Sequence, residues 1–387
     1  MLNRLIATAA ALMAPAASLS QPAASEQLDR RSVMEQAARV ADWQLARLND
    51  QRAVSRITGD TANPRAWEQA AFWVGMTEFA DAGAPQRFKE AVISMGRRNQ
   101  WLPGDRPFFA DDHAITQSYL WAAERGAGPT ARQPTKRLFD RILADPPVTT
   151  LAFYVPPGGY NEAECLKRWC WCDAIFMAPP AFLKLSLQTG DPRYRNFALK
   201  EFWATTDFLF DPVEQLYYRD SRFFERRDAK RRKQFWSRGN GWAFAGMARM
   251  IPMMPQGPER RRVEALFRQM AVKLKQLQKP DGYWAPSLLA PENAPPESSG
   301  TGFFTYGIAW GINAGLLDRR EYEPVVRRGW SGLVRAIQAD GRLGWVQQVS
   351  DRPEAVAATD TQYYGVGAFL LAASAITRLD AAKPPRR

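Results

Sequence analysis

Apolar residues recur along most of the chain at the spacing of one helix face. The span 263–277 places them at positions i, i+3, i+4 and i+7: Val263, Leu266, Phe267, Met270, Leu274 and Leu277. This spacing predicts a helix with one buried face. The span 322–337 repeats the pattern, whereas the alternation of apolar and polar residues that is typical of strands is scarce. We therefore expect an all-α protein.

The same pattern, read from end to end, predicts twelve helices. They run roughly over residues 26–50, 66–82, 86–99, 112–126, 130–143, 173–189, 193–209, 240–252, 258–278, 303–315, 322–338 and 362–378. Short turns such as 189–192 join neighbours, and longer loops with a related Asp-Gly signature recur between pairs. Such self-similarity indicates stacked helical hairpins. Six hairpins would close into an (α/α)6 barrel around a central pocket, and an open solenoid is the alternative.

The first 25 residues have the features of a secretory signal. Arg4 supplies the positive charge, an apolar stretch covers 5–17, and small residues follow through Ser20. No other run is long enough to span a bilayer, so we expect no membrane association after the signal is removed. We expect export to the periplasm or the extracellular space. Residues 26–387 contain no linker-like segment and are predicted to form a single domain.

The charge balance narrows the range of partners. The net charge is +12, and an exported basic protein is better matched to an acidic oligosaccharide or polysaccharide than to nucleic acid. Part of the surplus lies in runs such as 230–233, which are typical of solvated faces. A monomer is the favoured state.

Cysteine and histidine usage limits the chemistry. An odd count of cysteines, Cys165, Cys170 and Cys172, does not indicate a disulfide scaffold, so we expect buried thiols, with a Cys165–Cys170 bridge as the alternative. His113 is the only histidine, which argues against Ser-His-Asp and Cys-His catalysis and His-rich zinc sites. Neither a metal nor an organic cofactor is expected. Proton transfer must then rest mainly on carboxylates, Tyr or Lys.

One carboxylate is placed unusually. Trp171-Cys172-Asp173 precedes the apolar run 174–180, so Asp173 begins an apolar helix beside an indole. Burial of a carboxyl group disfavours its charged form and raises its pKa. Asp173 is therefore a candidate proton donor, and an N-cap of the following helix is the alternative role.

Three further segments concentrate polar residues. Asp111 and Asp112 open a helix, where they either cap it or place one carboxylate in the pocket. Glycines at 239 and 241 predict a tight turn that presents Arg238 between two indoles, where its guanidinium fork would grip a carboxylate. The segment 297–303 is expected to be a flexible loop that runs into a helix.

Taken together, these motifs resemble glycoside hydrolase family 105, the unsaturated rhamnogalacturonyl and related unsaturated uronyl hydrolases. The resemblance rests on Trp171–Asp173 with Phe176–Pro180, on Trp236–Trp242, on Asp111–Ile115 and on Ser299–Thr301, and covers roughly 35–380. It implies an (α/α)6 barrel. It also implies removal of a non-reducing-end uronate with a C4=C5 double bond from oligosaccharides that polysaccharide lyases produce, as in pectin degradation.

The resemblance also implies roles for individual residues. Asp173 matches the catalytic acid that protonates C4 and assists water at C5, and Asp112 is favoured over Asp111 as the second catalytic carboxylate. Arg238 matches the arginine near the substrate carboxylate. Further substrate-binding residues are expected at Trp171, Trp236, Trp242, Asp111, His113, Met177 and Arg219.

One position departs from the family pattern. Several members carry a histidine where this chain has Arg219, and the extra cation would tighten carboxylate binding or select a different uronate, such as a glucuronyl unit. Three other functions are compatible with the sequence. They are a conventional glycosidase on saturated acidic oligosaccharides, a non-catalytic uronate-binding protein, and a polysaccharide lyase.

Overall fold

The computed structural model of the protein describes residues 28–49 and 63–381, and the predicted signal segment lies outside them. The twelve predicted helices are present in the described residues, one of them divided in two. They are α1 (Arg30–Leu45), α2 (Trp67–Asp81), α3 (Gln86–Arg98), α4 (Ala110–Ala122), α5 (Gln133–Ala144), α6 (Ala174–Met177), α7 (Pro179–Thr189), α8 (Pro192–Leu209), α9 (Ser237–Met250), α10 (Pro258–Leu277), α11 (Ser298–Asn313), α12 (Arg319–Arg335) and α13 (Tyr363–Ala381). Short 3₁₀ or π turns are η3 (Ala123–Ala127), η4 (Pro129–Arg132), η5 (Tyr160–Glu162), η6 (Glu164–Lys167), η7 (Ser221–Phe223) and η8 (Ile251–Met253).

Two prolines cause the division between α6 and α7. The break falls at Ala178, directly before Pro179 and Pro180. A proline lacks a backbone N–H and disfavours the helical conformation of the residue before it. The pair therefore starts α7, where the missing donors cost nothing. The short helix α6 follows Asp173 immediately, so this carboxylate sits at a helix start as predicted.

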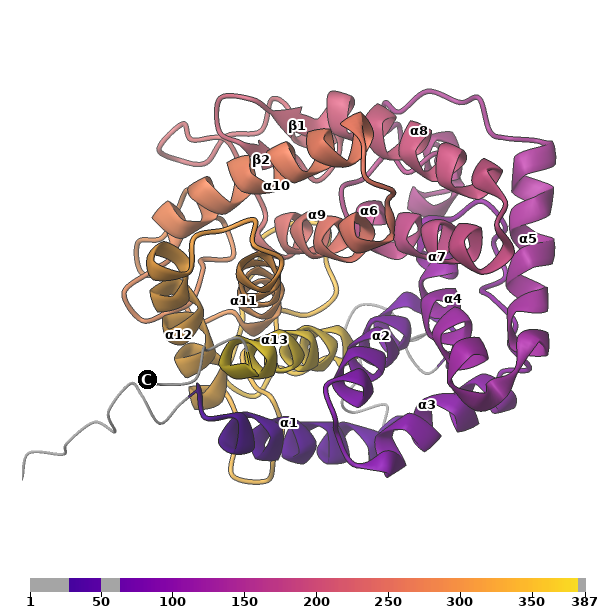
Figure 1. Ribbon diagram of the computed structural model, residues 1–387. Coiled ribbons are helices and arrows are strands. Elements are labelled where there is room, and N and C mark those ends of the chain that lie inside the picture. Colours follow the sequence, from indigo (N-terminus) through magenta and orange to yellow (C-terminus); the bar gives the residue numbers. More distant parts are fainter. Residues whose placement is uncertain (1–27, 50–62, 382–387) are drawn as a thin grey trace, which may run out of the picture.

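The helices form two concentric rings (Figure 1). Six positions make the inner ring: α2, α4, α6 with α7, α9, α11 and α13. Each inner helix contacts the next, and α13 returns to α2, so the ring is closed. The outer helices α1, α3, α5, α8, α10 and α12 cover it. The (α/α)6 barrel is thus confirmed, and the open solenoid is excluded.

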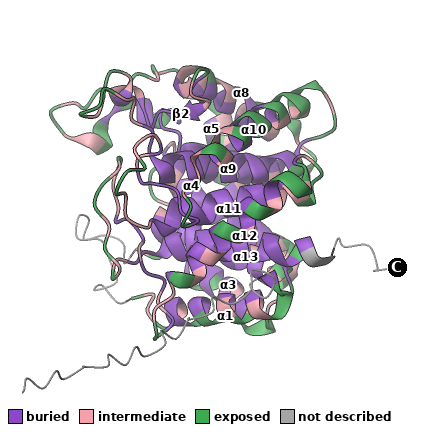
Figure 2. Ribbon diagram, turned by 90° about the vertical axis from the view of Figure 1, so that its left-hand side faces the viewer, coloured by how far each residue is buried: buried purple, intermediate pink, exposed green. Residues whose placement is uncertain are grey.

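Burial explains which helices lie inside. The outer helix α10 buries one stripe, which includes Val263, Phe267 and Met270, as its apolar spacing predicts. Inner helices such as α9 and α11 are buried almost all round (Figure 2). Glycines let inner helices touch: a Cβ on Gly75 of α2 would lie 2.4 Å from the carbonyl oxygen of Gly367 in α13. In the part of the chain described, no helix is long and apolar enough to cross a membrane.

The connections differ between the two ends of the barrel. Short turns lead from inner to outer helices, for example over 82–85 and 190–191. Long loops lead from outer to inner helices, over 145–173, 210–236, 278–297 and 336–362, and they gather at the left of Figure 2. The only two strands in the described residues, β1 (Phe210–Asp211) and β2 (Leu216–Tyr217), pair antiparallel in one of these loops. Consequently the inner helices all point their N-termini at the long-loop end.

Two predicted loops are helical instead. Gly239 and Gly241 lie in the first turns of α9, so the predicted tight turn is wrong. Their small size serves packing, because a Cβ on Gly241 would lie 3.0 Å from Phe303 of α11. Residues 298–303 form the start of α11, so the predicted flexible loop is also wrong. The Glu297 side chain caps this helix by accepting hydrogen bonds from the N–H groups of Ser299 (2.9 Å) and Gly300 (2.8 Å).

Candidate active site

A cavity of about 770 Å³ opens at the long-loop end of the barrel. Its wall combines the N-termini of α2, α4 and α6 with the loops 145–173, 217–222 and 349–354. The lining residues are Asn63, Arg65, Ala66, Trp67, Glu68, Gly104, Asp105, Arg106, Phe109, Asp111, Asp112, Tyr160, Asn161, Trp171, Asp173, Met177, Arg219, Val349, Ser350, Asp351, Arg352 and Glu354. Seven of these carry carboxyl groups and four are arginines. An anionic ligand would therefore depend on the placement of individual arginines.

Asp173 lies in this wall with only 7% of its surface exposed. Its Oδ2 atom is 3.3 Å from Arg219 Nε and 3.6 Å from the Cys172 sulfur. The side chain makes no capping hydrogen bond to α6, so the N-cap alternative is wrong. Burial raises the pKa of Asp173, while the positive charge of Arg219 opposes that rise. The group thus combines proton retention with access to the cavity.

Arg219 is the cation that meets Asp173. The guanidinium also pairs with Asp220 (2.9 Å) and donates a hydrogen bond to the Tyr160 hydroxyl (2.6 Å). Asp220 in turn pairs with Arg222 (2.7 Å), which reaches Asp351 of the next loop (2.7 Å). This network joins three loops of the cavity wall. The ion pair with the buried Asp220 and the hydrogen bond to Tyr160 hold the Arg219 guanidinium in place.

Arg238, in contrast, does not line the cavity. It is fully buried and donates hydrogen bonds to the carbonyl oxygens of Gln347 (2.7 Å) and Gln348 (2.8 Å). The guanidinium lies between two aromatic rings as predicted, but they belong to Trp236 (4.4 Å) and Tyr364 (4.6 Å). The donors of the fork are used by the loop 347–348, and the predicted grip on a substrate carboxylate stays a prediction.

The two acids that open α4 both line the cavity but differ in their partners. Asp112 pairs with Arg106 (2.6 Å) and accepts its backbone N–H (2.7 Å), and the preference for Asp112 as the second catalytic carboxylate stays a prediction. The Oδ1 atom of Asp111 is buried without a hydrogen-bond partner among the described residues. Burial raises the pKa of Asp111 to about 8; the charges of Asp173 and Asp112 add to the rise and Arg106 opposes it. Asp111 therefore favours its protonated form near neutral pH, and the charge of Asp173 contributes to this.

The remaining predicted residues divide into cavity and core. Trp171 and Met177 line the cavity. Trp236 and Trp242 are buried in the core, where Trp236 donates to Gln347 (3.1 Å). The His113 ring is also buried and donates from Nε2 to the Pro107 carbonyl oxygen (2.7 Å). Burial lowers the pKa of His113 to about 4, so the ring is neutral. Trp236, Trp242 and His113 thus lie outside the cavity lining, and their roles as substrate contacts stay predictions.

Three aromatic residues of the cavity were not predicted from the sequence: Trp67, Phe109 and Tyr160. Trp67 starts α2 and stacks on Tyr364 with ring centroids 5.2 Å apart. Phe109 packs against Trp171 at 5.1 Å. Flat rings in a cavity wall suit the faces of sugar rings. Their position in the sequence could have indicated Trp67 and Phe109 as cavity residues, because both lie at the starts of inner helices, as Asp111 and Asp173 do.

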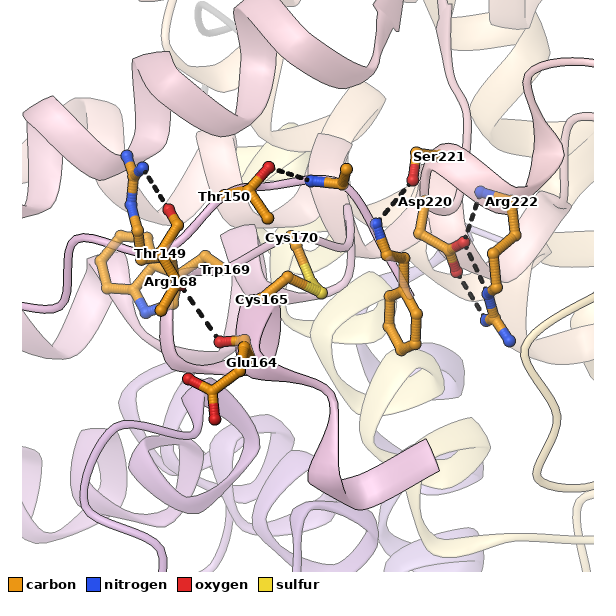
Figure 3. Close-up of a disulfide and its surroundings, with 12 residues drawn as sticks. Thr149, Thr150, Glu164, Cys165, Arg168, Trp169, Cys170, Asp220, Ser221 and Arg222 are labelled. Atoms are coloured by element: carbon orange, nitrogen blue, oxygen red, sulfur yellow. Dashed lines mark hydrogen bonds and ion pairs between the residues drawn. A yellow bond between two sulfur atoms is a disulfide. The ribbon is translucent and has the colours of Figure 1, made fainter. Parts of the chain in front are cut away.

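The cysteines differ from the expectation of three thiols. Cys165 and Cys170 form a disulfide in the loop that leads to Trp171 (Figure 3), and Cys172 is a buried free thiol. On one side of this loop, Arg168 donates to the Thr149 carbonyl oxygen (2.9 Å). The segment before Asp173 is thus held covalently and by hydrogen bonds. Within the ranges 28–49 and 63–381, no cluster of His, Cys, Asp and Glu could hold a metal ion.

Comparison with known proteins identifies the family of this chain. The family model described as Glycosyl Hydrolase Family 88 matches residues 36–380. A protein of Alteromonas sp. (strain LOR), named unsaturated 3S-rhamnoglycuronyl hydrolase, is 42% identical over 86% of this chain and 83% of its own length. A Formosa agariphila protein of the same name is 35% identical over 82% of this chain and 85% of its own.

Solved structures share the fold. A glycosyl hydrolase family 88 structure from Bacteroides vulgatus superposes with a TM-score of 0.77 at 28% identity, over 90% of this chain and 99% of that one. A structure from Salmonella enterica, described as a possible member of the GH105 family, has a TM-score of 0.75 at 17% identity, over 95% of this chain and 100% of that one. The resemblance found in the sequence is confirmed.

Proposed function

The chain belongs to Glycosyl Hydrolase Family 88, and on that premise we propose that it is a glycoside hydrolase that releases a 4,5-unsaturated uronic acid from the non-reducing end of oligosaccharides. One observation carries the proposed chemistry. A carboxylic acid of raised pKa, Asp173, contacts a fixed arginine, Arg219, in the wall of a cavity with aromatic sides.

Arg219 binds the uronate carboxylate in this proposal. Its guanidinium fork suits a carboxylate, and Asp220 and Tyr160 hold it so that little mobility is lost on binding. The added negative charge beside Asp173 then favours the protonated form of that acid. Substrate binding thus prepares the proton donor. The inner-helix N-termini, which point at the same end, add a positive potential for the anion.

Asp173 then delivers its proton to C4 of the double bond. Positive charge develops at C5 and is shared with the ring oxygen. A water molecule adds to C5 and gives a proton to the Asp173 carboxylate, which restores the acid. The resulting hemiketal opens to a ketone at C5, and the hemiacetal left at C1 releases the neighbouring sugar as an alcohol. One water is consumed, and Asp111 holds a hydroxyl group of the sugar or the attacking water.

The names of two relatives support a proposal for the aglycone. The relatives from Alteromonas and Formosa agariphila are named unsaturated 3S-rhamnoglycuronyl hydrolases, and we propose the same substrate class here, an unsaturated uronate joined to a rhamnose unit. Arg219 is in keeping with this choice over a pectin-derived rhamnogalacturonan disaccharide, because it departs from the histidine found in several family 105 members.

The test is a substrate panel followed by ultraviolet absorbance of the double bond. Purified protein should remove the absorbance of an unsaturated rhamnoglycuronyl disaccharide faster than that of an unsaturated rhamnogalacturonan disaccharide. Unchanged absorbance across all unsaturated uronyl disaccharides would reject the hydrolase. Cleavage of saturated oligosaccharides would indicate a conventional glycosidase. A rise of absorbance on intact polysaccharide would indicate a lyase, and binding without turnover would indicate a uronate-binding protein.

We also propose that the protein is exported. Support comes from the signal-like residues 1–25 and from the Cys165–Cys170 disulfide, since such bonds persist in oxidising compartments. Cell fractionation and N-terminal sequencing of the mature protein test this. Recovery of the intact N-terminus from the cytoplasm would reject it.

A further inference from the structure

We propose that Cys172 is a positioning residue: its thiol holds the Asp173 carboxylate by Oδ2 and leaves Oδ1 as the oxygen that exchanges a proton with the sugar. The inference rests on the proposed role of Asp173 as proton donor. Neither the sequence motif nor the relatives assign a function to this cysteine.

The contacts of Asp173 are unequal at its two oxygens. The Cys172 thiol donates to Oδ2 at 3.6 Å, within the range for sulfur donors, and Arg219 Nε lies 3.3 Å from the same oxygen. Arg219 Nε is nevertheless without a hydrogen-bond partner, so its N–H is not aimed at the carboxylate. Within the described residues, the thiol is therefore the side chain found to donate a hydrogen bond to Asp173, and it does so at Oδ2. No side-chain hydrogen bond to Oδ1 is found in the same part of the chain.

The thiol itself is held and stays protonated. Its sulfur packs against α9, where a Cβ on Gly239 would lie 3.1 Å away. The backbone N–H of Cys172 donates to the Arg219 carbonyl oxygen at 2.9 Å, which ties the two partners of Asp173 together. Burial raises the pKa of the Cys172 thiol well above its usual range, the charge of Asp173 adds to this and Arg219 opposes it. The thiol therefore keeps its donor hydrogen at neutral pH.

A thiol suits this position because it is a weak donor. A strong donor to a carboxylate stabilises the anion and lowers its pKa, which would take the proton away from the acid. A thiol orients the carboxylate with little such effect. The charged and titratable groups around Asp173 are Cys172 in its own segment, Arg219 and Asp220 in the loop after β2, Asp111 of α4 and Arg238 of α9.

The contact can be observed without turnover. Cys165 and Cys170 are joined, so the three cysteines of the chain leave Cys172 as the only thiol, and the S–H stretching band of the Raman spectrum belongs to it alone. We expect this band below the frequency of a free thiol, moving further down as rising pH ionises Asp173. An S–H band that lies at the free-thiol frequency and does not shift with pH would overturn the proposal, even if the protein hydrolyses its substrate.

Two variants test the consequence for catalysis. Cys172→Ser introduces a stronger donor, so the alkaline limb of the kcat profile should move to lower pH. Cys172→Ala removes the donor, so the limb should move to higher pH and kcat should fall about tenfold. Ser118→Ala, a similar truncation in the buried face of α4 away from the cavity lining, serves as the control and should keep the wild-type profile. Profiles of both Cys172 variants that coincide with wild type would also overturn the proposal.

Discussion

Arg219 Nε lies 3.3 Å from Asp173 Oδ2, so the proposed proton donor carries its own counter-ion in the free protein. A uronate that binds Arg219 competes with Asp173 for that charge. The acid is then most acidic when the cavity is empty and holds its proton best when the substrate is bound.

Asp173→Asn should abolish the proposed chemistry while keeping the fold. An amide cannot donate a proton to C4 or accept one from water, and general acid–base groups contribute about 10²-fold to 10⁴-fold in rate. The loss of double-bond absorbance on an unsaturated uronyl disaccharide measures this. Asp105→Asn is a matched control, because that carboxylate is largely exposed at the same cavity. Wild-type rates in Asp173→Asn would remove this residue from the mechanism.

Arg219→Lys should raise KM more than it lowers kcat. The ammonium group keeps the charge but replaces the fork that would hold the uronate, so we expect KM to rise about tenfold. Initial rates over a range of substrate concentrations separate the two constants. An unchanged KM would mean that the carboxylate binds elsewhere in the cavity.

Arg238→Lys should behave in the opposite way. Its guanidinium satisfies the carbonyl oxygens of Gln347 and Gln348 in the core, and an unmet buried group costs about 1–3 kcal/mol. We therefore expect a lower free energy of unfolding in urea, with KM close to wild type. A large rise in KM without loss of stability would support Arg238 as a substrate contact.

Asp111 makes stability depend on pH in a defined direction. Its folded pKa of about 8 lies above the usual value of 3.8, so the folded state binds this proton more tightly than the unfolded state does. The contribution is fully present below about pH 4 and is lost progressively as the pH rises to about 8. Asp111→Asn should remove this pH dependence, which is on the order of 2 kcal/mol in the free energy of unfolding. The wild type should therefore lose stability between pH 5 and pH 8, and the variant should lose less. Urea unfolding of both proteins at the two pH values is the measurement. Parallel changes in the two proteins would contradict the raised pKa.

The Cys165–Cys170 bond should stabilise the loop that leads to Asp173. Replacing both cysteines with serine should cost about 2 kcal/mol, since the bond restricts the unfolded chain over only a short loop. Thermal melting should show the same loss in wild type after reduction with dithiothreitol. The double variant should not respond to the reductant, and equal melting temperatures throughout would argue against the bond in the mature protein.

Helix number and barrel class were predictable because outer helices such as α10 display one apolar stripe and because hairpins recur. The N-terminal boundaries of α9 and α11 were harder to predict from the sequence. Gly239 and Gly241 are turn signals locally, but here they allow close contact between inner helices. Only the neighbouring helix explains them, and the sequence around position 240 contains no sign of that neighbour.

The candidate site was predictable at Asp173, whose apolar surroundings are adjacent in sequence. The burial of Arg238 was not predictable, because its partners, the carbonyl oxygens of Gln347 and Gln348, belong to a distant loop. The choice between Asp111 and Asp112 depends on which of two neighbouring positions in a helix turn meets Arg106. Such a choice is set by tertiary contacts and not by local pattern.

The closure of the inner ring has a consequence for how the chain acquires its structure. The last helix, α13, packs against α2 and α11, so the contact that completes the barrel joins segments from opposite ends of the sequence. A nascent chain cannot make this contact until synthesis is nearly finished, and until then the apolar faces of α2 and α11 lack their cover. Loss of the C-terminal helix would leave the newly made polypeptide unable to mature, however intact the residues around the cavity.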